Sequence, residues 1–296
     1  RALQKVWSQL GRTRYDLVAT LYYDRRYRLL SLPVVSRRHI RLQKDSRNLQ
    51  LLHGRHHTDE FARILLSASR AADTGPAPHS LAPLRPEGLP ASPLGLSSQK
   101  RVTLTPGGAR NALRDDRLRR WQTSHYAELA RLLIQTGHEV VLTGGPGDLW
   151  VREAFADLPC IDLIDQLTLP QLLALFDSSD AVVTHDSGPL HLAGVTSCAL
   201  LGVFGPVDPW MRLPRRPGAV ALWGGEGFAC RPCYDGASYA DCKENLCMAQ
   251  ITPEFAFDTL LRMLDQKAAG DLQPPAVLLP QSTAPLVSIA TVSEPS

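Results

Sequence analysis

The chain has 296 residues, and its 44% hydrophobic and 21% charged residues are typical of a globular protein with room for two domains. No stretch approaches 18 uninterrupted apolar residues, which excludes a transmembrane helix of the usual length. No signal-peptide pattern is visible at the start, which reads as a helix from Arg1 to Leu10.

Positive charge is concentrated near the N-terminus. Residues 1–72 contain 15 Lys and Arg but 5 Asp and Glu, a net charge of +10, whereas the remainder carries −7. Such a basic region attracts phosphate-rich partners, either nucleic acid, an anionic membrane surface or a phosphorylated glycolipid. A solvated Arg-rich face without a partner explains the charge equally well. A nucleic-acid partner would rest on this charge alone.

Three segments outside the middle of the chain have distinct compositions. Residues 15–21 read as a buried strand after the first helix. Pro and Gly become frequent between Asp73 and Ser98, which predicts a loop or interdomain linker. The tail from about Ala268 is rich in Pro, Ser, Thr and Ala, and we expect it to be disordered.

The middle of the chain alternates between strands and helices. Strands are expected at 101–105, 139–143, 181–184 and 199–204, and helices at 124–135, 172–176 and from 190 to 195. Thr123 or Ser124 can cap the first of these helices, Gly137 suits its end, and Thr168 to Gln171 is a capping box for the second. The alternation predicts a parallel sheet with right-handed crossovers, whose ligands bind at the carboxyl ends of the strands.

The densest motif runs from Thr184 to Ala193, Thr-His-Asp-Ser-Gly-Pro-Leu-His-Leu-Ala. It follows a strand and opens a helix, where free backbone N–H groups favour an anion such as a diphosphate. Gly188 permits close approach of a ligand. Asp186 can accept hydrogen bonds from sugar hydroxyls or cap the helix, and His191 can donate to a phosphate or to Asp186. A capped turn with a packed histidine explains this motif alone equally well.

With its neighbours, this motif resembles glycosyltransferase family 9, the lipopolysaccharide heptosyltransferases. The family's Phe/Tyr-Gly-Pro-Thr-Asp-Pro turn corresponds to Phe204–Pro209, where Val207 replaces the usual Thr. The resemblance is strong from residue 101 on and weak before it. Four further matches extend it: Pro106–Asn111, Arg119–Trp121, Leu142–Pro146, and the cysteines of Cys230-x-Pro-Cys233 and Cys247-Met248.

The resemblance implies the α/β GT-B fold, two facing Rossmann-like domains. We expect an acceptor-side domain with the linker at 1–98, apparently without its first strand, a donor-binding domain at 99–267 and the tail at 268–296. The family moves a heptose from ADP-heptose to the inner core of lipopolysaccharide, with inversion and without a catalytic metal.

The resemblance also assigns roles to single residues. Arg119 stands where the family usually has Lys and would hold the donor diphosphate, with a fork of donors instead of a point charge. The other residues implied to contact the donor are Gly108, Asn111, Asp148 (ribose), Leu167 (adenine), Asp186, Ser187, Gly188 and His191.

The catalytic base implied by the family is not found. It is an Asp in a Gly-Asp turn before the first helix, and residues 1–20 contain no such turn. We expect that the segment carrying it precedes Arg1; the alternative is a chain that lacks the base and binds donor without efficient transfer.

Four of the six cysteines, Cys230, Cys233, Cys242 and Cys247, follow the pattern C-x₂-C-x₈-C-x₄-C. They can form a structural zinc site, but the second spacing is shorter than in the commonest zinc ribbons, which favours plain loop thiols. No cofactor is otherwise required. Cys160 and Cys198 read as core thiols. His53, His56 and His57 form a surface turn for which a metal cluster, contacts to acceptor phosphates or no role are all open.

The expected partners are an ADP-sugar donor, a lipid A and core oligosaccharide acceptor and the inner-leaflet surface, with no nucleic acid. The expected location is cytoplasmic, peripherally associated with the inner membrane. The alternatives are another GT-B nucleotide-sugar enzyme, either a non-heptose transferase or an epimerase, and a degenerate donor-binding protein without catalysis.

Overall fold

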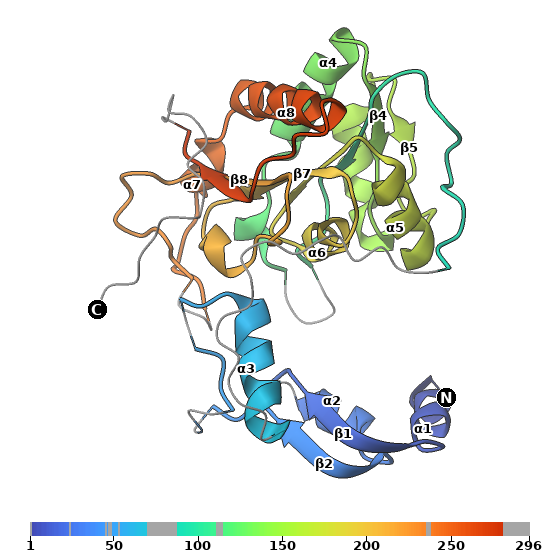
Figure 1. Cartoon of the computed structure of the whole chain (residues 1–296). Coiled ribbons are helices and arrows are strands. Elements are labelled where there is room, and N and C mark those ends of the chain that lie inside the picture. The colour runs from blue at the N-terminus through green and yellow to red at the C-terminus, as the bar shows by residue number, and fades with distance from the viewer. Residues whose placement is uncertain are drawn as a thin grey trace. The chain divides into compact units, whose positions relative to one another are not determined.

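The computed structural model of the chain describes residues 2–23, 25–44, 46, 49–52, 54–69, 88–110, 115–234 and 238–280 (Figure 1). Contacts divide the chain into two compact units, residues 1–77 and 78–296. The boundary falls inside the segment that the sequence predicts as a linker, and most of that segment lies outside the described residues.

The first unit is built on two parallel strands, β1 (Arg14–Thr20) and β2 (Val35–Arg41). Its helices are α1 (Ala2–Leu10), α2 (Arg25–Leu30) and α3 (His57–Ser69). A small core of Ile40, Leu42 and Ile64 lies under α3. The predicted first helix and first strand are confirmed, but the strand is not buried: within the described residues β1 pairs with β2 alone, and Leu17 is 37% exposed.

The second unit is built on one seven-stranded, all-parallel sheet in the order β5-β4-β3-β6-β7-β8-β9. The predicted parallel sheet is therefore confirmed. Its strands are β3 (Arg101–Thr105), β4 (Glu139–Leu142), β5 (Ile161–Asp162), β6 (Ala181–His185), β7 (Ala199–Phe204), β8 (Ala219–Trp223) and β9 (Ala276–Leu278).

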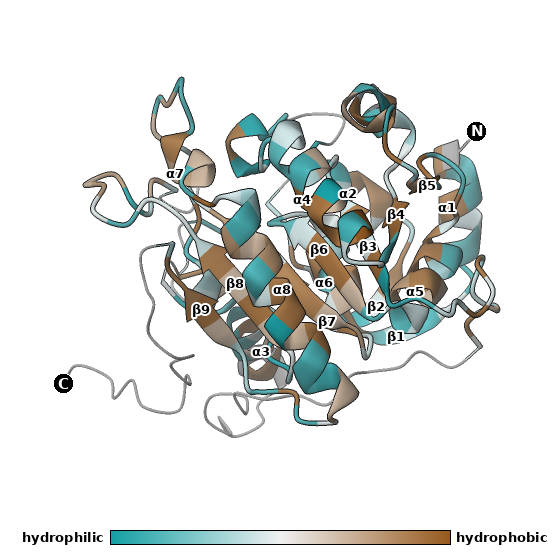
Figure 2. Ribbon diagram, turned by 90° about the horizontal axis from the view of Figure 1, so that it is seen from above, coloured by the Kyte–Doolittle hydropathy of each residue, from teal (hydrophilic) through white to brown (hydrophobic). Residues whose placement is uncertain are grey.

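Helices cover both faces of this sheet (Figure 1). Val183 of β6 packs toward α4 (Thr123–Gln135) and α8 (Pro253–Ala268), whereas Val182 packs toward α5 (Leu169–Ser178) and α6 (Gly188–Gly194). Because strand residues alternate between faces, a strand covered on both sides is mostly apolar, and the central strands are largely brown in Figure 2. Shorter elements are α7 (Leu246–Ala249) and 3₁₀ turns at Arg117–Arg119, Pro146–Phe155 and Pro209–Met211.

The strand order reverses between β3 and β6. From β3 the chain adds β4 and β5 on one side, and from β6 it adds β7, β8 and β9 on the other. The loops leaving β3 and β6 therefore diverge, and in sheets of this kind ligands bind at the carboxyl ends of the two strands where the order reverses. This is the position at which the fold places a ligand site.

Local signals in the sequence have mixed outcomes. The capping box is confirmed, since Thr168 N donates to Gln171 Oε1 at 3.0 Å. Gly137 has a φ of +80° after α4, as predicted for a left-handed helix stop. The predicted Thr or Ser cap of α4 is wrong, because Gln122 is the N-cap and its side chain makes no capping bond. Trp121 Nε1 instead donates to Ile251 O at 2.8 Å, so a tertiary contact fixes the chain there.

The predicted disordered tail from residue 268 is wrong for its first part. Residues 276–278 form β9, which pairs with β8 in parallel, and Ala276 and Leu278 are buried. A three-residue apolar run is enough to extend a sheet edge, although it is hidden among Pro and Gln in the sequence. Residues 281–296 lie outside the described residues. No helix in the described part of the chain has the length and apolar character needed to cross a membrane.

The hydrogen bonds of the buried Arg216 side chain should stabilise the second unit. Its Nη2 donates to Cys198 O at 2.6 Å and Ala193 O at 3.0 Å, and its Nε donates to Gly194 O at 3.1 Å. Arg216→Met leaves these buried carbonyls without donors, so we expect the free energy of unfolding to fall by roughly 2–4 kcal/mol in denaturant titration. Arg262→Met, on the exposed side of α8, should change it by less than about 0.5 kcal/mol. If the two substitutions lower the free energy of unfolding equally, the hydrogen bonds of Arg216 do not stabilise the fold as proposed.

Candidate functional site

The loops that follow β3 and β6 meet at the reversal point of the sheet. The two strands end side by side, and Thr105 Oγ1 donates to Thr184 Oγ1 at 2.6 Å. Gly108, in the loop after β3, has a φ of +85°, and a Cβ added there would lie 3.7 Å from the Ser187 side chain. The structure therefore brings together two segments, near residues 108 and 187, that the sequence analysis assigned to one donor site.

A buried ion pair lies at this point. Arg119 Nη2 is 3.1 Å from Asp186 Oδ1, and the two side chains are 16% and 2% exposed. Arg119 ends the 3₁₀ turn Arg117–Arg119, where Asp116 Oδ2 accepts from its Nη1 at 3.4 Å. Burial disfavours the charge of Arg119, but Asp186, Tyr239 and Asp116 together outweigh it and raise the pKa of the guanidinium. Arg119 thus stays charged.

The polar atoms of this pair are not fully used by the protein. Apart from the ion-pair contact, neither carboxylate oxygen of Asp186 nor Nε of Arg119 has a hydrogen-bond partner within the described part of the chain. A buried polar atom without a partner costs about 1–3 kcal/mol, and such atoms in a native fold call for an explanation. A polar ligand that satisfies both residues provides one.

His185, beside this pair, was not singled out in the sequence. It is fully buried, and its Nδ1 lies 3.2 Å from the hydroxyl of Tyr126. Burial first, and then the charge of Arg119, lower the pKa of His185 to about 3, so the ring is neutral. Its Nε2 has no hydrogen-bond partner among the residues described. A polar residue at the last position of a buried strand was the signal that could have identified it.

Asp148 holds the two neighbouring turns together. Its Oδ1 accepts from Gly108 N and its Oδ2 from Gly145 N, both at 2.8 Å. A Cβ at Gly107 would lie 2.4 Å from Asp148 Cγ, so glycine is required there for this contact. The ribose contact expected of Asp148 stays a prediction, while the two hydrogen bonds give the carboxylate a positioning role that the sequence did not indicate.

The other predicted donor residues differ in their placement. Ser187 is the buried N-cap of α6, directly before Gly188, and its Oγ donates to His185 O at 3.2 Å instead of capping the helix. His191, on the second turn of α6, has an exposed side chain. Partial desolvation of its ring lowers its pKa, and the charge of Asp186 opposes this effect. Leu167 is half-buried ahead of α5. Asn111 lies outside the described residues.

Four cysteines lie in the segment that follows β8. Burial raises the pKa of Tyr239 to about 12, and the charges of Arg119, Asp116 and Asp186 also act on its hydroxyl, so this residue lies near the ion pair. The structure brings Cys230, Cys233, Cys242 and Cys247 to one cavity of about 390 Å³, which Leu118 also lines. Within the described residues, no three His, Cys, Asp or Glu side chains are already arranged to hold a metal ion. The predicted core thiol Cys198 is buried, and Cys160 is half-buried.

Comparisons with known proteins agree with this fold. Over 155 residues, 49% of the chain, it is 32% identical to lipooligosaccharide heptosyltransferase 2 of Haemophilus influenzae, of which the match covers 43%. Over 98 residues, 31% of the chain, it is 37% identical to lipopolysaccharide heptosyltransferase 2 of Escherichia coli, of which the match covers 28%. The chain therefore spans less than half the length of these curated relatives.

The solved structure of the ADP-heptose lipopolysaccharide heptosyltransferase II of E. coli has the same α/β fold. It superposes with a TM-score of 0.63 at 23% identity, over 90% of this chain and 81% of that one. Residues 90–243 match the family model described as glycosyltransferase family 9 (heptosyltransferase). Since this match covers just over half of the sequence, the chain belongs to glycosyltransferase family 9.

Proposed function

We propose that the protein transfers a heptose from ADP-heptose to the inner core of lipopolysaccharide. Family membership supports the class of reaction. The observation that carries the proposal is the buried Arg119–Asp186 pair, whose polar atoms remain available at the carboxyl ends of β3 and β6. The GT-B arrangement implied by the resemblance, with donor and acceptor on different units, is part of this proposal.

The charges of the site suggest how an ADP-sugar would lie. A diphosphate is repelled by the Asp186 carboxylate and attracted by Arg119, so the diphosphate belongs on the Arg119 side, near Gly108. The sugar hydroxyls then belong beside Asp186, whose oxygens can accept their hydrogen bonds. Neutral His185 adds no second positive charge, which keeps Arg119 as the main cation at the diphosphate.

In the proposed reaction, an acceptor hydroxyl attacks the anomeric carbon of the heptose and the bond from that carbon to the diphosphate oxygen breaks. The product is inverted at that carbon, and ADP leaves with the bonding electrons. Arg119 would stabilise the charge that develops on the leaving diphosphate, which gives the step a cation supplied by the chain itself. The base that takes the acceptor proton is not assigned to a residue of this chain.

The acceptor side of the proposal rests on the basic first unit. Arg37 and Arg38 are exposed on β2, and Arg37 forms a surface ion pair with Asp16 at 3.1 Å, which contributes little in water. We propose that this surface associates peripherally with the anionic inner leaflet, where a lipid A and core acceptor would lie. The cytoplasmic location belongs to the same proposal.

Arg119 is the sharpest test of the donor site. A charge-assisted contact to a diphosphate contributes roughly 1.5–3 kcal/mol, so Arg119→Ala should weaken ADP binding about ten- to a hundred-fold in calorimetry, and Arg119→Lys less. Since Arg119→Ala leaves Asp186 buried without its cation, the change is also made together with Asp186→Asn, which removes that charge.

Arg117→Ala is the matched control, because Arg117 is exposed on the same 3₁₀ turn. It should bind ADP as the parent protein does. If Arg117→Ala and Arg119→Ala lose affinity equally, or if the parent binds ADP no better than adenosine, the diphosphate assignment is wrong.

The basic surface is tested by co-sedimentation with vesicles that contain anionic phospholipid. Clustered basic residues gain about 1 kcal/mol each near such a surface, and salt screens this attraction. The protein should therefore sediment at low salt and be released at high salt. Neutralising Arg37, Arg38 and Arg41 to Gln should weaken sedimentation without changing the affinity for ADP.

The control for this test neutralises three exposed arginines of the second unit, Arg131, Arg152 and Arg262. These changes should leave sedimentation near that of the parent protein. Two results would refute the membrane proposal: no sedimentation at low ionic strength, or equal losses in the two triple variants.

A further inference from the structure

The segment between β8 and α7 has almost no regular structure. Its described residues, 224–234 and 238–245, contain no helix or strand, apart from one bridge between Tyr234 and Tyr239. Loops of this length without secondary structure are uncommon in compact domains and are usually either functional or disordered. The conformation of this loop therefore needs a source of stability other than backbone pairing.

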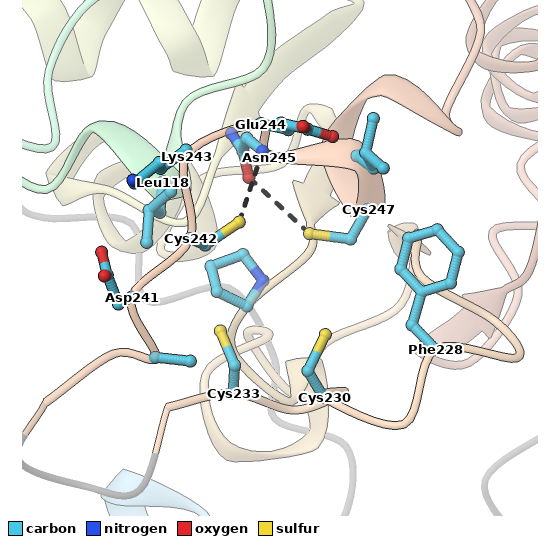
Figure 3. A pocket seen from close by; sticks show the side chains of 13 residues that line it. Leu118, Phe228, Cys230, Cys233, Asp241, Cys242, Lys243, Glu244, Asn245 and Cys247 are labelled. Carbon is cyan, nitrogen blue, oxygen red and sulfur yellow. Dashed lines mark hydrogen bonds between the residues drawn. The ribbon is translucent and has the colours of Figure 1, made fainter.

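Four thiols converge where that source would be. Cys230, Cys233, Cys242 and Cys247 line the cavity of about 390 Å³, and their sulfur atoms point into it from two sides of the loop (Figure 3). All four are free thiols. The spacings within the two pairs, C-x₂-C and C-x₄-C, are those with which structural zinc sites take two ligands from one turn.

The surroundings suit sulfur that carries negative charge. Asn245 N donates to Cys242 Sγ at 3.4 Å, and Asn245 adopts a left-handed conformation with a φ of +51° that directs this N–H. Lys243 also lines the cavity.

We propose that Cys230, Cys233, Cys242 and Cys247 bind one Zn²⁺ as four thiolates in a structural site. Binding releases the thiol protons to solvent and leaves a tetrahedral cross-link between the two ends of the loop. In the structure the sulfurs are not yet in ligand geometry. Cys230 and Cys242 are exposed, and rotation of their side chains can move the sulfurs onto the metal.

A bound metal would restrict the segment that carries Tyr239, near the carboxyl ends of β3 and β6. Tyr239 lies between Cys233 and Cys242 in the sequence, and its hydroxyl is close enough to Arg119 and Asp186 to feel their charges. A metal held by the cysteines on either side restricts this tyrosine. The metal site itself does not depend on the proposed transferase function, because metal content is measured without donor or acceptor.

The test is the metal content of the full chain, purified under reducing conditions from zinc-supplemented medium. We expect about one Zn²⁺ per chain by mass spectrometry of the metal. Replacement by Co²⁺ should give the intense near-ultraviolet band of cobalt bound to several thiolates. The double variant Cys230→Ser, Cys233→Ser should lose the metal and the band, and unfold at lower temperature than the parent.

Cys160→Ser is the matched control, since Cys160 is half-buried outside this cavity, and it should keep the metal. The proposal is overturned if the parent chain binds neither Zn²⁺ nor Co²⁺, or if the double variant retains both. It is equally overturned if intact mass shows that the four cysteines of the reduced and repurified protein are paired in disulfides and no metal is bound.

Discussion

The site depends on the pairing of β3 with β6. Both strands run in the same direction and are hydrogen-bonded neighbours, but the chain leaves them toward opposite edges of the sheet. In doubly wound sheets ligands bind at this point, where the polar residues at the ends of the two strands meet. Gly107 leaves room for the Asp148 side chain, Gly108 adopts a φ of +85°, and Asp148 ties this loop to the turn after β4. The strand order thus determines where the site lies, and Gly107 allows the loop after β3 to pack against Asp148.

The polar residues at this point of the sheet have different roles. Asp148 has its oxygens satisfied by backbone N–H groups, which fits a residue that positions the turns. Arg119 and Asp186 form a charged pair with unused polar atoms, which fits residues that bind. His185 is buried, neutral and held by Tyr126, so it shapes the floor of the site without adding charge. The positive Arg119 beside the Asp186 carboxylate would match a ligand in which a diphosphate is next to sugar hydroxyls.

The second unit was more predictable from the sequence than the first. The central strands β3, β6 and β7 are buried along their whole length and appear where the sequence predicts them, because a strand covered on both faces is rich in apolar residues. β9 was missed because three residues give no periodicity. The motif at residues 184–193 located the site, but the partners of Asp148 and His185 depend on contacts between segments far apart in the chain, and no local pattern encodes them. The exposure of β1 depends likewise on which strands lie beside it.

The most direct measurement is a crystal structure of the chain with ADP bound. The account predicts the diphosphate at the carboxyl ends of β3 and β6, in contact with the Arg119 guanidinium and close to Gly108 and Gly188, with room beside Asp186 for a sugar. Diphosphate density in the cysteine-lined cavity or on the first unit, with the Arg119–Asp186 pair untouched, would contradict it.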